Sequence, residues 1–141
     1  MTGANSGIGF HAAKIFAEQG ANVVLACRSV ERGRDAASDM DGETEVIELD
    51  LASKESIRQF LGNLSGGFDV LVNNAGVMNI PWKTTEFGFE YQFGVNFLGH
   101  FYLNSLVLDQ LRPEGRVVTV TSLAMRGGEL DFDSLNEKET Y

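Results

Sequence analysis

A glycine-rich turn near the start of the chain has the residue types and spacing that point most directly to chemistry. Residues 2–9 read T-G-A-N-S-G-I-G, with glycines at positions 3, 7 and 9. Glycine lets a backbone turn tightly and approach a phosphate without a Cβ in the way. A helix predicted over Gly9–Gln19 would direct its N-terminal amides and positive dipole end at that anion. The pattern indicates a site for a dinucleotide's diphosphate, and a ligand-free strand-to-helix turn is the alternative.

The end of the strand predicted over Asn22–Arg28 bears on which dinucleotide would bind. Arg28 stands there, and no acidic residue does. In dinucleotide-binding folds an acid at this position hydrogen-bonds the ribose 2′-hydroxyl, whereas an arginine accommodates a 2′-phosphate. The sequence therefore favours NADP as cofactor, with NAD possible. A solvated or salt-bridged Arg28 is the alternative interpretation.

Two further strand ends carry polar residues that suit a cofactor site. Asp50 and Leu51 close the strand predicted over Glu45–Leu51, where residues of such folds face the adenine pocket. Asp50 could equally cap the helix predicted from Ser53. The run N-N-A-G at 73–76 places small residues and amides where a cofactor would pass close to the backbone. A plain Asn-rich turn without a ligand is the alternative interpretation.

The elements that must position these residues alternate between strand-like and helix-like patterns. Apolar runs rich in Val, Ile and Leu predict strands over Asn22–Arg28, Glu45–Leu51, Asp69–Asn73 and Arg116–Ser122. Helices are predicted over Val30–Met40, Ser53–Leu64 and Thr85–Leu111, and the polar segment 127–141 is predicted to be a loop. The alternation predicts one α/β domain over 1–141: a Rossmann-like doubly wound parallel sheet with three layers, α/β/α.

The helix predicted over Thr85–Leu111 is unusually aromatic and would be roughly 40 Å long. A helix that is apolar on most of its surface is buried on more than one side. We therefore consider it a possible interface of a homo-oligomer.

Composition and charge exclude several classes of function. The 141 residues carry a net charge of −9, so a surface that binds nucleic acid or an anionic membrane is not expected. The single cysteine, Cys27, excludes an internal disulfide and a multi-cysteine metal site, and no metal is predicted. A reducing, cytoplasmic location is the default expectation, since the sequence shows neither a signal peptide nor a transmembrane segment.

Taken together, the motifs resemble those of the short-chain dehydrogenase/reductase family, and more narrowly its retinol-dehydrogenase-like branch. They occur in the family's order over nearly the whole chain. The matching segments are T-G-A-N-S-G-I-G (2–9), A-C-R (26–28), L-D-L (49–51), N-N-A-G (73–76), V-N-F-L-G-H-F (95–101) and V-V-T-V-T-S (117–122).

The resemblance implies a role for each matching position. The diphosphate loop would comprise Gly3, Asn5, Ser6, Gly7, Ile8 and Gly9. Arg28 matches the mark of NADP preference, and Asp50 and Leu51 match the adenine contacts. The residues that support the central sheet and the nicotinamide ribose would be Asn73, Ala75 and Gly76.

The resemblance also implies an oxidoreductase that moves hydride between nicotinamide and a carbonyl or alcohol substrate. Asn96 matches the active-site Asn whose backbone helps to hold a proton-relay water. Ser122 matches the catalytic Ser that hydrogen-bonds the substrate oxygen. No catalytic role is predicted for His11 or His100.

The chain departs from the family pattern at its two ends. The family's acid/base Tyr requires a Lys four residues later to lower its pKa, and no residue follows Tyr141. We therefore do not assign Tyr141 that role, and the first strand is reduced to Met1 and Thr2. The sequence is expected to be a fragment of a longer oxidoreductase.

Two other functions compete with this interpretation. A non-catalytic nucleotide-binding or interaction module is the main alternative, because the Tyr and Lys pair is missing. An extended-type nucleotide-sugar epimerase is disfavoured, since N-N-A-G together with V-T-V-T-S fits the short-chain pattern better.

Overall fold

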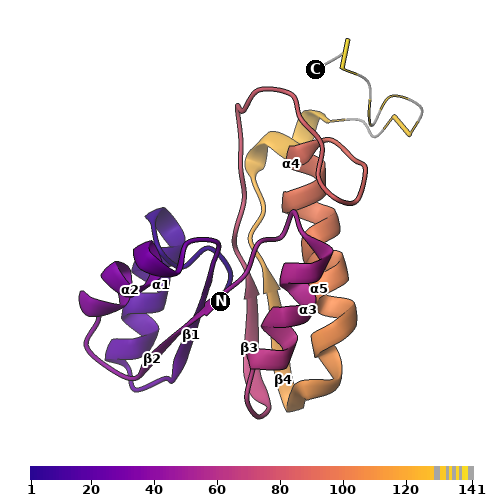
Figure 1. The fold of residues 1–141 in the computed structure, drawn as a ribbon. Coiled ribbons are helices and arrows are strands. Elements are labelled where there is room, and N and C mark those ends of the chain that lie inside the picture. The colour runs from indigo at the N-terminus through magenta and orange to yellow at the C-terminus, as the bar shows by residue number, and fades with distance from the viewer. Residues whose placement is uncertain (129–130, 133, 135, 137, 140–141) are drawn as a thin grey trace.

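Four strands that pair in parallel, with helices on either side, make up the described part of the chain (Figure 1). The computed structural model describes residues 1–128, 131–132, 134, 136 and 138–139. Tyr141, which we did not assign as the catalytic Tyr, lies outside the described residues. No helix within the described part is both long and apolar enough to cross a bilayer.

The strands and helices follow the predicted alternation. The strands are β1 (Val23–Cys27), β2 (Thr44–Glu48), β3 (Phe68–Asn73) and β4 (Leu111–Thr119). The α-helices are α1 (Gly7–Glu18), α2 (Val30–Ser38), α3 (Lys54–Asn63), α4 (Tyr91–Phe93) and α5 (His100–Val107). A π-helical segment, η1 (Gly94–Gly99), joins α4 to α5, and two 3₁₀ segments are η2 (Leu108–Gln110) and η3 (Leu123–Gly127).

Residues 1–3 join two strand pairs into one sheet. β1 pairs with β2 and β3 pairs with β4, each in parallel. On one side Ala26 N donates to Met1 O at 2.9 Å, and Gly3 N donates to Ala26 O at 2.9 Å. On the other side Thr2 N donates to Val72 O at 3.0 Å. The order across the sheet is therefore β2, β1, Met1–Thr2, β3, β4, with the first residues of the chain at its centre.

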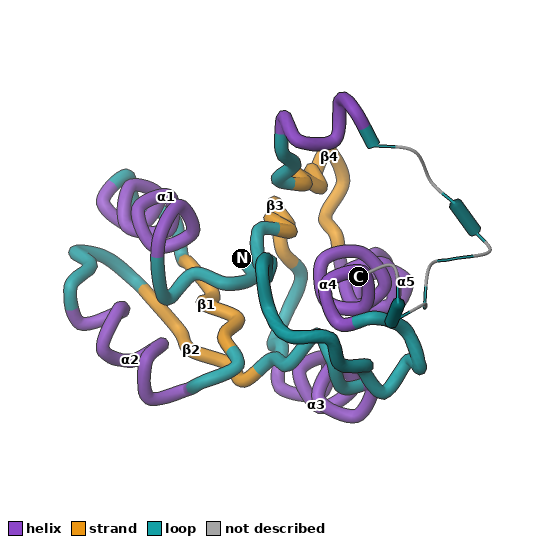
Figure 2. The backbone as a smooth tube through the Cα atoms, turned by 90° about the horizontal axis from the view of Figure 1, so that it is seen from above, coloured by secondary structure: helices purple, strands orange, loops and turns teal. Residues whose placement is uncertain are grey.

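The side chains of β1 alternate between two apolar cores, one on each face of the sheet. Val23, Leu25 and Cys27 pack into a core with alanines of α1 and α2. Ala26 belongs to the other core, with residues of α3 and α5 such as Ile57 and Leu103. Figure 2 shows α1 and α2 on one side of the strands and α3 and α5 on the other. This arrangement confirms the doubly wound, three-layer α/β fold.

The helix predicted over Thr85–Leu111 is wrong at both ends. The Glu90 carboxylate accepts hydrogen bonds from Gln92 N and Phe93 N, both at 2.8 Å, and so starts the helix at Tyr91. Residues 84–90 form a tight turn instead, closed by an antiparallel bridge between Thr84 and Glu90 and containing Gly88 at a φ of 80°. At the other end Leu111 already belongs to β4. Aromatic periodicity alone did not reveal these stops.

The strand predicted over Arg116–Ser122 is also displaced. β4 begins at Leu111, and its regular register with β3 runs from Arg116 to Thr119. An irregularity precedes that stretch, where Glu114 has a φ of 67°. Val120 N still donates to Asn73 O at 2.9 Å, so Ser122 lies just beyond the end of the sheet.

Candidate functional site

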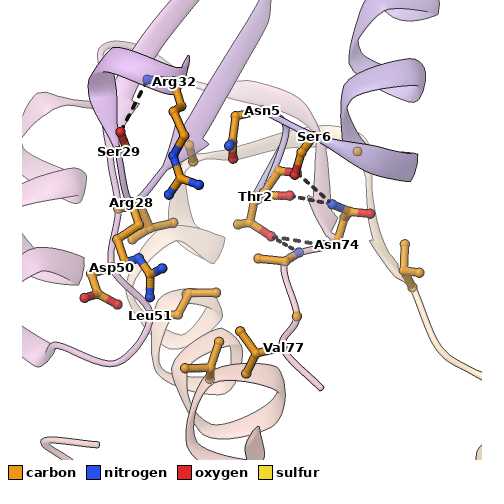
Figure 3. A pocket seen from close by; sticks show the side chains of 18 of the residues that line it. Thr2, Asn5, Ser6, Arg28, Ser29, Arg32, Asp50, Leu51, Asn74 and Val77 are labelled. Atoms are coloured by element: carbon orange, nitrogen blue, oxygen red, sulfur yellow. Dashed lines mark hydrogen bonds between the residues drawn. The ribbon is translucent and has the colours of Figure 1, made fainter. Parts of the chain in front are cut away.

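A cavity of about 420 Å³ opens where the strands reach their carboxyl ends (Figure 3). Its walls come from the glycine-rich turn and from the segments that follow β1, β2 and β3, with Val120 after β4. In open α/β sheets, ligands bind outside the carboxyl ends of the strands. Ten of the predicted cofactor-binding residues line this cavity: Gly3, Asn5, Ser6, Ile8, Gly9, Arg28, Asp50, Leu51, Ala75 and Gly76.

The three glycines of the first turn have different roles. A Cβ on Gly3, which has a φ of 64°, would lie 2.8 Å from the Cα of Ala75. A Cβ on Gly9 would lie 2.3 Å from Gly3 O and 2.4 Å from Asn74 Nδ2. Gly7 has a φ of 55° and open space where its Cβ would be, and it does not line the cavity. Gly3 and Gly9 therefore permit close packing of the turn on residues 74–75, whereas Gly7 serves the backbone conformation.

The N-terminus of α1 differs from those of α2 and α3. Ser29 Oγ accepts from Arg32 N at 3.3 Å, and Ser53 Oγ accepts from Ser56 N at 3.2 Å. Ser6, the N-cap of α1, makes no such side-chain bond, and it lies at the cavity. Uncapped first-turn amides and the positive end of the helix dipole are suited to an anion. This end of the cavity therefore fits the diphosphate of a dinucleotide.

Two arginines also bring positive charge to the cavity. Arg28 and Arg32 both line it, and Figure 3 shows their guanidinium groups across from Thr2 and Asn74. Arg28 Nη1 donates to Tyr91 Oη at 3.2 Å, and neither arginine forms a salt bridge with a carboxylate in the described part of the chain. The sequence pointed to Arg28 alone. The signal for Arg32 was its position in the first turn of a helix that starts at the cavity.

Asp50 and Leu51 reach the cavity as predicted, but Asp50 does not cap α3. Its Oδ1 accepts from Ala52 N at 2.9 Å in a local turn, and its own N donates to Ser56 Oγ at 2.8 Å. The cap of α3 is Ser53. Of the two roles considered for Asp50, the helix cap is therefore wrong. Asp50 is a turn residue that lines the cavity.

The N-N-A-G segment divides between sheet and cavity. Asn73 does not line the cavity; it is buried, and its Nδ2 donates to Thr119 Oγ1 at 3.4 Å, which links β3 to β4. Asn74, for which the motifs predicted no separate role, donates from Nδ2 to Thr2 O at 2.9 Å and to Gly3 O at 3.2 Å. The amide of Asn74 thus fixes the glycine turn against the end of β3.

Asn96 lies beside the cavity and does not line it. Its Oδ1 accepts from Val77 N at 2.8 Å and its Nδ2 donates to Val77 O at 2.9 Å. A Cβ on Gly76 would lie 3.4 Å from that Oδ1. Asn96 belongs to η1, and π-helical segments are frequent at functional sites. Ser122 also lies outside the lining, exposed and two residues past Val120.

A doubly wound parallel sheet with a glycine-rich first turn and a cavity at its strand ends places the chain among the Rossmann-like α/β proteins. A family profile described as short chain dehydrogenase matches residues 1–131. The chain therefore belongs to the short-chain dehydrogenases, a family of NAD(P)-dependent oxidoreductases, as its motifs indicated.

Relatives and solved structures agree with this assignment. The chain is 48% identical to human retinol dehydrogenase 13 over 146 residues, which covers 96% of this chain and 44% of that protein. It is similar to a putative uncharacterized protein from Mycobacterium paratuberculosis, with a TM-score of 0.88 and 47% identity over 96% of this chain and 49% of that one.

A solved alcohol dehydrogenase from the archaeon Thermococcus sibiricus, complexed with 5-hydroxy-NADP, is also similar. Its TM-score is 0.77 and its identity 29%, over 92% of this chain and 59% of that one. The resemblance to the retinol-dehydrogenase-like branch is confirmed by these comparisons, and the chain spans about half the length of the curated relatives it matches.

Proposed function

We propose that this chain forms the cofactor-binding part of an NADP(H)-dependent oxidoreductase acting on an alcohol or carbonyl compound. The observation that carries the proposal is one cavity whose wall holds both an uncapped helix N-terminus and two arginines, Arg28 and Arg32. When bound, the cofactor supplies the hydride chemistry, and the protein supplies position and charge.

In this proposal the two ends of the cavity hold the two phosphate-bearing parts of the cofactor. Gly3, Ser6, Ile8 and Gly9 lie at the cavity with the first turn of α1, where amide donors would hold the diphosphate. Asn5 and Gly7 belong to the same loop. The small Ala75 and Gly76 leave room for the backbone to approach the nicotinamide ribose, and Leu51 provides an apolar wall for the adenine.

Arg28 and Arg32 would bind the 2′-phosphate that distinguishes NADP from NAD. Tyr91, which is buried, accepts a hydrogen bond from Arg28 and so restrains the guanidinium at the cavity. A restrained guanidinium can grip a phosphate through two parallel hydrogen bonds. The alcohol dehydrogenase complexed with 5-hydroxy-NADP supports a phosphorylated cofactor for this fold.

Ser122 and Asn96 are the proposed catalytic residues. Ser122 follows β4 and would donate a hydrogen bond to the substrate oxygen, which polarises it for hydride transfer. Asn96 would organise the proton relay from the edge of the cavity, where its side chain holds Val77. The chain resembles retinol dehydrogenases, and their names suggest a retinoid among its substrates.

The test is a comparison of NADPH and NADH binding by fluorescence titration of the full-length protein. Arg28→Ala should weaken NADPH binding by about 13- to 150-fold, since a hydrogen bond to a charged group is worth roughly 1.5–3 kcal/mol. NADH binding should change little. Arg34→Ala is the matched control, because Arg34 is exposed on α2 and does not line the cavity. Equal losses for NADPH and NADH would refute the role of Arg28.

Two further properties stay predictions. A homo-oligomer would use the outer face of η1 and α5, where Phe97 and Phe101 are exposed and their rings stack at 6.3 Å. Light scattering of the full-length protein tests this. A cytoplasmic location is proposed from the sequence, with Cys27 free and buried, and imaging of a tagged protein tests it.

A further inference from the structure

His100 is a buried histidine that bonds on both sides of its ring to residues of the recognised motifs. It is the first residue of α5 and is 6% exposed. Its Nε2 lies 2.9 Å from Thr2 Oγ1, and its Nδ1 lies 3.1 Å from the carbonyl oxygen of Asn96. The ring therefore joins the glycine-rich turn to η1, and the His100–Thr2 contact spans 98 residues of the chain.

The partners of the ring fix which nitrogen carries its proton. The Asn96 carbonyl can only accept, so Nδ1 must donate. Thr2 Oγ1 already accepts from Asn74 N at 2.9 Å and from Ala75 N at 3.0 Å. The hydroxyl must therefore donate its own proton, and the nearer acceptor is Nε2 at 2.9 Å, against 3.5 Å for Val72 O. The ring is neutral and protonated at Nδ1.

Both arms of this ring lead to the same stretch of the cavity wall, residues 74–77. One arm runs through Thr2, whose hydroxyl holds the amides of Asn74 and Ala75. The other runs through Asn96, whose side chain holds both the N–H and the C=O of Val77. The wall segment is thus fixed at its beginning and at its end by two residues that His100 connects.

We propose that His100 is a positioning residue that sets the geometry of wall residues 74–77 by coupling Thr2 to Asn96. The proposal concerns the same cavity as the proposed function. It rests on that function only where its test measures NADPH binding. The coupling itself is a property of the protein without cofactor. A histidine that merely filled space would be replaceable by an apolar side chain of similar size.

The first test is the tautomer, read by nitrogen NMR of the full-length protein labelled at histidine, without cofactor. The His100 signal, identified by its loss in His100→Gln, should show a protonated Nδ1 and an unprotonated Nε2 at pH 7.5. A signal with Nε2 protonated would overturn the proposal, because the Thr2 hydroxyl would then have no role as donor to the ring. This outcome is independent of any cofactor.

The second test is a double-mutant cycle on NADPH affinity, with His100→Leu, Thr2→Val and the double variant. Each single change should raise the Kd for NADPH about 2- to 13-fold, the range for one lost hydrogen bond of about 0.5–1.5 kcal/mol. The double variant should lose no more than the worse single variant. A double variant whose increase in Kd equals the product of the two single increases would overturn the coupling. The double variant of His11→Leu and Thr2→Val is the matched control. Its change in the Kd for NADPH should equal the product of the two single changes, since His11 is exposed on α1.

Conservative variants separate positioning from folding. Thr2→Ser keeps the hydroxyl and should restore most of the affinity lost in Thr2→Val. Hydrogen exchange of His100→Leu should rise in residues 72–78 while the core of α2 and β2 keeps its protection. A uniform rise would overturn the proposal and assign His100 a general packing role. Wild-type protein that does not bind NADPH would refute the proposed function, and the tautomer and exchange results would still decide the role of His100.

Discussion

The substitution Gly9→Ala tests the idea that the glycine turn is shaped by packing against residues 74–75. The added Cβ would lie 2.3 Å from Gly3 O and 2.4 Å from Asn74 Nδ2, and the first of these is backbone. Overpacking of this kind costs about 1–3 kcal/mol. Asn74 would also have to give up its bonds to Thr2 O and Gly3 O, each worth about 0.5–1.5 kcal/mol.

A compensating term comes from the helix. Gly9 lies in α1, and replacing a helical glycine by alanine gains about 1 kcal/mol of helix propensity. The net expectation for Gly9→Ala is a free energy of unfolding about 1–5 kcal/mol lower than wild type. Gly62→Ala is the matched control, because Gly62 lies in α3 and, apart from its chain neighbours and the backbone of its own helix, nothing lies within 4 Å of its Cβ position. It should raise stability by up to about 1 kcal/mol.

Urea denaturation of the full-length protein without cofactor measures both variants against wild type. The two substitutions have the same chemistry and both lie in helices, so opposite signs isolate the contact at Gly9. If Gly9→Ala matched wild type, or shifted the midpoint in the same direction as Gly62→Ala, the close packing of the turn on Asn74 would be refuted.

Two further predictions concern His100 and the helix caps. Burial lowers the pKa of His100 below its ordinary 6.5, so below that pH the unfolded chain takes up a proton that the folded chain refuses. The free energy of unfolding should therefore fall as the pH drops from about 6.5. In urea titrations at pH 7.5 and 5.5, the free energy of unfolding of His100→Gln should fall less between the two pH values than that of wild type. An identical pH dependence in the two proteins would contradict this. Ser29→Ala removes the bond that caps α2 at Arg32 N and should lower stability by about 0.5–2 kcal/mol. Ser6→Ala removes no capping bond, so its free energy of unfolding should stay within about 0.5 kcal/mol of wild type. Equal shifts of the thermal midpoint in Ser29→Ala and Ser6→Ala would argue against this difference.

Local patterns in the sequence were sufficient for the order of the elements. The apolar runs around Val23–Cys27 and Phe68–Asn73 predicted parallel strands, because residues covered on both faces of a sheet are apolar without interruption. Both strands form, but only β1 is buried along most of its length, whereas Asp69 and Val70 of β3 are exposed. The glycine spacing at 3, 7 and 9 predicted the turn into α1. These features depend on neighbours in the chain, which the sequence displays directly.

The ends of the aromatic helix were not readable in the same way. Phe87 and Phe89 continue the aromatic pattern on the N-terminal side, but the helix starts only at Tyr91, where the Glu90 carboxylate caps the first amides. Arg32 could not be predicted from the sequence for a related reason. Its place at the cavity depends on the direction in which α2 leaves β1, and that direction is set by the packing of α2 on the sheet.

What the sequence by itself determined is the class of the protein: an α/β chain whose ordered motifs belong to the short-chain dehydrogenases. What only the tertiary structure decided is which side chains act together. Thr2 stands far from both Asn74 and His100 in the chain, and its hydrogen bonds to them form because the fold packs the first residues between the end of β3 and the start of α5. A hydrogen bond requires its atoms within about 3 Å, and only the packed fold sets distances on that scale.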